Sequence, residues 1–191
     1  MKKAMQWVLI AALTLGSASL ATALPAEPDN DSRLSVAQSQ DRIVRDVRHE
    51  LVMLPWLSVF DNLNYKVDGS TVTLLGEVRN AVLKDEAQAA VKHIEGVEQV
   101  NNNIEILPVS FNDDRIRRQM ARELFRDPRL FVYSLQSVPP IHIVVKNGHV
   151  TLEGVVRDQG DKDVAGIRAN SVPGVFSVEN NLQVERQQAR K

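Results

Sequence analysis

The stretch that decides the fold is Ile141–Val156, which reads IHIVVKNGHVTLEGVV. Asn147-Gly148 at its centre is a strong signal for a type I′ turn, because both central positions of that turn need a positive φ. The apolar residues on either side alternate with polar ones and so share one face of a strand pair. We therefore predict an antiparallel hairpin with one covered face. Its expected pairs are Lys146 with His149, Val145 with Val150, Ile143 with Leu152 and His142 with Glu153.

The hairpin motif occurs twice in the chain. The first copy lies 78 residues earlier and is centred on Gly69-Ser70, a pair whose leading Gly suits a type II′ turn. The same shift holds downstream, where Gly96-Val97 matches Gly174-Val175. The matching positions of the first hairpin are Tyr65, Val67, Val72, Leu74, Gly76 and Val78. The chain is therefore a tandem duplication of one module.

Each hairpin is preceded by an amphipathic helix and followed by a second helix and a third strand. In the first module, Ile43, Val47 and Leu51 mark the apolar stripe of a helix expected from about Ser39 to Met53. The remaining expected elements are a helix over 81–93 capped by Asn80, a strand over 97–107, a helix over about 112–126 capped by Asn112, a helix over about 158–170 with an Asp cap and a strand over 175–185. This α-β-β-α-β order, repeated, predicts the α+β class.

The ends of the chain carry a different pattern. Lys2-Lys3, the apolar run Trp7–Leu15 and Ala21-Thr22-Ala23 have the form of a cleavable export signal. The apolar run is short for a spanning helix, and an uncleaved anchor is the alternative reading. We expect cleavage after Ala23 and a soluble periplasmic product. The expected boundaries are signal peptide 1–23, flexible lead-in 24–38, module 1 at 39–107, linker 108–111, module 2 at 112–185 and a polar tail at 186–191.

Composition excludes several classes of function. The chain has 191 residues and no cysteine, which rules out disulfides, thiol catalysis and lipidation of an N-terminal Cys. Loss of Lys2 and Lys3 with the signal peptide leaves 21 basic and 24 acidic residues, a net charge near −3. A nucleic-acid binder is typically basic, so that class is not expected. No cofactor is expected either.

In its motifs and their spacing, the chain resembles the BON domain family, named for bacterial OsmY and nodulation proteins. The resemblance rests on the pattern V-x-V-x-x-G-x-V-x-L-x-G-x-V followed by a helix and G-V-x-x-V-x-N-x-L-x-V. The second copy carries it almost completely, and the first departs at Ser70 and Leu75. The resemblance covers about residues 39–185. It implies two helices on one face of a three-stranded mixed sheet, and an exported, non-enzymatic protein that binds phospholipid or other envelope components.

Candidate catalytic and metal-binding residues are few. The predicted register places His142 opposite Glu153 and puts His149 at the far end of the ladder, so the two histidines cannot share an ion. Zinc sites need three or four converging ligands, and surface histidine is the expected role. The His142–Glu153 pair is interpreted as a cross-strand contact on a polar face rather than as an acid-base pair. No metal site and no catalytic residues are predicted.

The first helix of module 2 offers the best functional lead. Four arginines recur at spacings of three and four, on a face roughly opposite the apolar stripe Ile116, Met120 and Leu124. They are Arg115, Arg118, Arg122 and Arg126. Like charges at this spacing weaken an isolated helix, so the stripe favours an anionic partner such as a lipid headgroup. A solvated helix face, relieved by nearby acidic residues, is the alternative.

An apolar connector, Asp127–Pro140, follows this helix. Leu130, Phe131 and Tyr133 would complete an amphipathic lipid-binding surface if their side chains were exposed beside the arginines. If they pack into the core, that contribution is lost. We therefore expect a peripheral binder of anionic phospholipid, and the family resemblance implies that it supports envelope integrity or osmotic-stress tolerance. The alternative is a protein-interaction or chaperone-like adaptor that uses a sheet edge or the apolar connectors.

Overall fold

Each half of the chain folds as a helix, a hairpin, a second helix and a third strand beside the hairpin. The computed structural model describes residues 30–136 and 138–185. The elements, in chain order, are α1 (Asn30–Val52), β1 (Asn62–Asp68), β2 (Thr71–Val78), α2 (Ala81–Lys92), β3 (Gln99–Asn102), β4 (Glu105–Ile106), α3 (Phe111–Arg126), the 3-10 helix η1 (Phe131–Leu135), β5 (Ile141–Lys146), β6 (His149–Val156), α4 (Gln159–Asn170), β7 (Ser177–Asn180) and β8 (Gln183–Val184). The predicted α+β organisation in two copies is confirmed.

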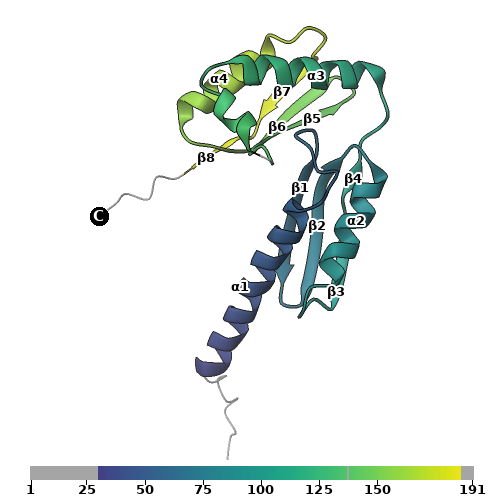
Figure 1. Cartoon of the computed structure of the whole chain (residues 1–191), viewed down its shortest axis with the longest axis vertical. Coiled ribbons are helices and arrows are strands. Elements are labelled where there is room, and N and C mark those ends of the chain that lie inside the picture. The colour runs from purple at the N-terminus through teal and green to yellow at the C-terminus, as the bar shows by residue number, and fades with distance from the viewer. Residues whose placement is uncertain (1–29, 137, 186–191) are drawn as a thin grey trace, which may run out of the picture.

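The two sheets have the same mixed topology. In module 1, β2 is central and pairs with β1 in antiparallel and with β3 and β4 in parallel. In module 2, β6 takes the central place between β5 on one side and β7 and β8 on the other. The helices of each module lie on one face of its sheet (Figure 1). This leaves β1 and β5 as edge strands.

The two hairpins have the predicted registers. Lys146 pairs with His149 and His142 with Glu153, as expected. Asn147 and Gly148 have φ values of 53° and 79°, which fits the type I′ turn. The turn of the first hairpin has its positive φ, 59°, at Gly69.

Two glycines within strands, Gly76 and Gly154, lie very close to the backbone of the neighbouring segment. A Cβ on Gly154 would lie 2.0 Å from the carbonyl oxygen of Pro140, and one on Gly76 would lie 2.0 Å from that of Asn62. Both glycines also have a positive φ, 117° and 109° respectively. Both positions therefore require glycine, because the neighbouring backbone leaves no room for a side chain.

The third strand of each module is interrupted, which the sequence did not predict. In module 1 the side chain of Asn102 donates to the carbonyl of Lys84 at 3.0 Å and accepts from the amide of Ile104 at 3.2 Å. Asn180 makes the equivalent contacts with Lys162 and Leu182 in module 2. In each case the asparagine ties the strand to the second helix and divides it into two short segments.

The helix boundaries differ from the predicted ones at two places. α1 begins at Asn30, so residues 30–38, expected to be part of a flexible lead-in, are helical. No Pro or Gly occurs between Asn30 and Val52 to stop the helix. α3 is capped by Ser110 rather than Asn112, since the Ser110 side chain accepts from the amide of Asp113. The caps predicted at Asn80 and Asp158 are confirmed. The predicted signal peptide lies outside the described residues.

The modules have separate cores that meet through one connector. The core of module 1 includes Ile43, Val47 and Leu51, as the helix periodicity predicted. Val59 and Phe60 follow α1 in sequence, yet they pack against the core of module 2. Among residues 30–136 and 138–185, no helix is both long and apolar enough to span a bilayer.

Candidate functional site

The predicted arginine stripe lies on the exposed side of α3. Arg115, Arg118, Arg122 and Arg126 are exposed, whereas the opposite apolar stripe, Ile116, Met120 and Leu124, is fully buried. Figure 1 shows α3 and α4 on the side of the module 2 sheet that faces away from module 1. The stripe is therefore accessible to a flat partner.

The charges of this stripe are mostly unneutralised. Arg115 donates to the side-chain oxygen of Asn112 at 2.9 Å. Within the described ranges, Arg118, Arg122 and Arg126 form no ion pair and no side-chain hydrogen bond. All N–H donors of these three guanidinium groups thus remain available to a ligand. A guanidinium group can bind phosphate through two parallel hydrogen bonds, that is, in a bidentate manner.

A fifth arginine of the same helix has a different task. Arg117 is 3% exposed. It forms an ion pair with Asp114 at 2.7 Å and donates to the carbonyl of Val145 on β5. The sequence reasoning overlooked it, although its position three residues before Met120 and seven before Leu124 places it on the core side. Arg117 thus anchors α3 to the sheet and is unavailable to a ligand.

The start of α3 is fixed to the β5–β6 turn. The carboxylate of Asp113 accepts hydrogen bonds from the amides of Asn147 at 2.9 Å and Gly148 at 2.8 Å. These two amides would otherwise be unpaired in the tight turn. The position of the arginine stripe is therefore rigidly coupled to the hairpin that decides the fold.

Two exposed aromatic residues lie near this turn, and the sequence analysis missed both. Phe111, the first residue of α3, is 93% exposed, and Phe176 is 77% exposed. The Phe176 ring covers Gly148, where an added Cβ would lie 2.5 Å from it, and its centroid is 5.9 Å from that of His149. Arg115 reaches the same region, because its guanidinium lies 2.9 Å from the place of a Cβ on Gly174. Phe176 and Arg115 together form an amphipathic patch, called here the tip patch.

The connector contributes less than the sequence suggested. Leu130 is fully buried and Tyr133 is 4% exposed, so both belong to the core of module 2. Their inclusion in a lipid-contacting surface is therefore corrected: the condition that their side chains be exposed is not met. Phe131 is 52% exposed and stays a candidate.

Tyr133 is held by a buried acid. Its hydroxyl donates to the carboxylate of Asp161 at 2.6 Å, and Arg129 and Arg157 donate to the same carboxylate at 2.9 and 3.0 Å. Burial alone would raise the pKa of Asp161, but the hydrogen bonds from Tyr133, Arg129 and Arg157 bring that pKa below its ordinary value. This cluster closes the connector over α4 and serves stability.

His142 lies between the modules rather than on an open surface, which corrects the expectation of a surface histidine. Burial lowers its pKa, while a hydrogen bond with the Asp61 backbone and the charges of Asp61 and Glu153 act in the opposite direction. Its Nδ1 is buried without a partner among the described residues. Within those residues no group of three His, Cys, Asp or Glu side chains is arranged to hold a metal ion.

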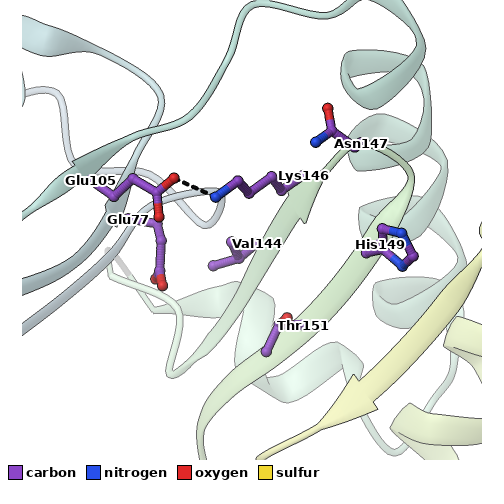
Figure 2. A pocket seen from close by; sticks show the side chains of 7 residues that line it. All are labelled: Glu77, Glu105, Val144, Lys146, Asn147, His149 and Thr151. Atoms are coloured by element: carbon purple, nitrogen blue, oxygen red, sulfur yellow. Dashed lines mark hydrogen bonds and ion pairs between the residues drawn. The ribbon is translucent and has the colours of Figure 1, made fainter.

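A polar cleft of about 370 Å³ separates the open face of the module 2 sheet from module 1. Figure 2 shows Lys146 reaching from β5 to Glu105, with which it forms an ion pair, and Glu77 beside it. Burial, followed by the charges of Glu153 and Glu105, raises the pKa of Glu77 against the opposing hydrogen bond from Asn62. The ion pair joins the two modules.

Comparisons with known proteins agree with this architecture. A family model for the BON domain matches residues 39–108 and 112–186. The chain is 31% identical over 112 residues to the outer membrane lipoprotein DolP of Haemophilus influenzae, covering 56% of this chain and 54% of that protein. It is 28% identical over 133 residues to the osmotically-inducible protein Y of Escherichia coli, covering 65% of this chain and 62% of that protein.

The chain thus spans somewhat more than half the length of these two relatives. Among solved structures, the C-terminal domain of CdsD, a structural protein of the type III secretion system of Chlamydia trachomatis, aligns at 15% identity with a TM-score of 0.28, covering 76% of this chain and 98% of that one. The two matched segments coincide with the two modules described above and together cover most of the sequence. The chain therefore belongs to the BON domain family.

Proposed function

We propose that this protein is an exported, non-enzymatic member of its family that binds anionic phospholipid at the cell envelope through α3 of module 2. The observation that carries the proposal is the set of three exposed and unpaired guanidinium groups, Arg118, Arg122 and Arg126. Its physiological role would be to support envelope integrity or tolerance of osmotic stress. The two relatives, an outer membrane lipoprotein and an osmotically-inducible protein, support that setting.

Binding would be peripheral and largely electrostatic. Arginines on one helix face meet the phosphates of the headgroups, and each basic residue near an anionic membrane contributes about 1 kcal/mol. The tip patch adds Phe176, and Phe111 lies at the start of α3; the exposed rings of both can enter the headgroup boundary. The modest number of apolar groups means that attachment is reversible and sensitive to salt.

The test is charge reversal on α3. Arg118→Glu with Arg122→Glu should abolish flotation with vesicles that contain phosphatidylglycerol, because the stripe then repels the surface. The matched control is Arg42→Glu with Arg45→Glu on α1, which makes the same change of net charge at exposed positions of module 1. The control should float as the unmodified protein does. Equal loss in both variants would show a general charge effect, and equal flotation would refute the assignment to α3.

A further inference from the structure

The duplication places Tyr65 of β1 and Ile143 of β5 at equivalent positions of two edge strands. The hairpins close with the pairs Asp68–Thr71 and Lys146–His149. The closing pair of a two-residue hairpin is hydrogen bonded, and from there hydrogen-bonded pairs alternate with non-hydrogen-bonded pairs. Tyr65 and Ile143 belong to non-hydrogen-bonded pairs, so their backbone N–H and C=O groups point away from the partner strand, toward the open edge of the sheet. Both strands therefore offer donors and acceptors to an extended segment.

In module 2 this edge is already occupied. The amide of Ile143 donates to the carbonyl of Val59 at 2.8 Å, and the carbonyl of Val145 accepts from Arg117. Val59 and Phe60 pack against the core of module 2, as do Ala121 and Phe125 of α3. The occupant of the edge is thus the turn Ser58–Asp61, closed by a 3.1 Å hydrogen bond from the amide of Asp61 to the carbonyl of Ser58, with a β-branched and an aromatic residue at its centre.

In module 1 the equivalent place is an open groove of about 590 Å³. Arg48 and Val52 of α1 correspond to Ala121 and Phe125 at the shift of 73 residues that relates the first helices. The groove is lined by Arg48, Leu51, Val52, Leu63 and Tyr65 from module 1, and by Val138, Pro139 and Pro140 among others from module 2. Among the described residues, no group outside the β1–β2 ladder bonds to the backbone of Leu63 or Tyr65.

We propose that this groove binds an extended apolar segment of another polypeptide, which adds as a strand to the edge of β1. The contact between Val59 and Ile143 shows that the duplicated edge accepts a backbone partner from outside its own sheet, and the groove is also lined by Pro140 and His142, which are close to Ile143 in sequence. A peptide satisfies the outward backbone groups of Leu63 and Tyr65, whereas a lipid chain offers no hydrogen bond.

The positive charge of Arg48 indicates which residues the bound segment should contain. Arg48 lines the groove and, among the described residues, its side chain has no ion pair or hydrogen bond. An acidic residue next to the apolar pair would complement it. The connector of this chain already has that order, since Asp61 follows Val59 and Phe60. The segment recognised therefore combines a β-branched residue, an aromatic residue and a carboxylate.

The proposal is tested with a fluorescein-labelled synthetic peptide of the sequence WLSVFDN, which copies residues 56–62. Fluorescence anisotropy with residues 24–191 should show saturable binding. Val52→Glu should weaken it by about tenfold or more, because a charge would enter the apolar groove. Val82→Glu is the matched control, since Val82 is exposed to a similar degree, 49% against 44%, but lies on α2 away from the groove.

A second peptide separates strand addition from apolar adsorption. Methylation of its backbone amides removes the N–H donors that strand addition needs but keeps the carbonyl acceptors and the side chains, so binding should weaken markedly. Arg118→Glu with Arg122→Glu should leave peptide binding unchanged, which separates this site from the proposed lipid surface. Absence of saturable binding, equal binding by Val52→Glu, or equal binding of the methylated peptide would overturn the proposal. Displacement of the peptide by phosphatidylglycerol vesicles in the Arg118→Glu, Arg122→Glu background would also overturn it, in favour of a lipid occupant.

Discussion

The carbonyl oxygen of Val59 in module 1 accepts a 2.8 Å hydrogen bond from the backbone amide of Ile143 in module 2. This bond closes part of an edge strand that would otherwise be open to pairing with another chain. Phe60 continues the contact, and the guanidinium of Arg79 lies 5.5 Å from the centre of its ring. Arg79 also approaches Asp114 of α3 at 3.8 Å. The connector of the first copy is thus a structural part of the second.

Phe60→Ala should uncouple the modules. The half-buried ring packs against the core of module 2, so its removal should destabilise that module by about 2 kcal/mol. Calorimetry should show the module 2 transition moving to lower temperature and away from that of module 1. Trp56→Ala, in the same connector but 64% exposed, should change the transition little. Identical melting of Phe60→Ala and the unmodified protein would contradict the role given to this contact.

Asp161→Asn should destabilise module 2 through the buried cluster. An amide cannot accept from Tyr133, Arg129 and Arg157 as the carboxylate does, and we expect a loss of about 3 kcal/mol. Because the folded-state pKa of Asp161 lies below its ordinary value, this stabilisation is present above about pH 4 and is lost as the pH falls further. Urea unfolding at pH 7 and pH 3 should show a difference between the two proteins that shrinks at the lower pH. A constant difference would contradict this linkage.

His142 should make the contact between the modules sensitive to mild acid. Burial holds its folded-state pKa below the unfolded value of about 6.5, so the unfolded chain binds the proton more readily. Stability should therefore decrease as the pH falls through and below about 6.5. His142→Gln keeps a donor for the Asp61 carbonyl but does not titrate. The urea midpoint should fall more between pH 7.5 and 5.5 for the unmodified protein than for His142→Gln, and equal falls would refute the assignment.

The parts of the fold set by local chemistry were predictable from the sequence. Asn147-Gly148 specifies its turn, and the alternation around it specifies the register, so the pairing of His142 with Glu153 followed directly. The caps at Asn80 and Asp158 are equally local. The periodicity of α3 separated the buried apolar stripe from the exposed arginines for the same reason.

Contacts between the copies could not be predicted in this way. Val59 and Phe60 look like ordinary connector residues, and nothing near them in the sequence indicates that they pack against module 2. His142 is on a face predicted to be polar, but module 1 covers it. Leu130 and Tyr133 were ambiguous because an apolar connector can be exposed or buried, and only the partner Asp161 decides the outcome for Tyr133.

The central claim is that α3 of module 2 binds an anionic lipid surface. The most direct measurement is flotation of residues 24–191 with vesicles of phosphatidylcholine alone or mixed with phosphatidylglycerol, at low and at high salt. We predict flotation only with the anionic vesicles and its loss at high salt, because screening weakens exposed charge interactions. Absence of flotation with anionic vesicles at low salt, or equal flotation with both lipids at both salt concentrations, would contradict the claim.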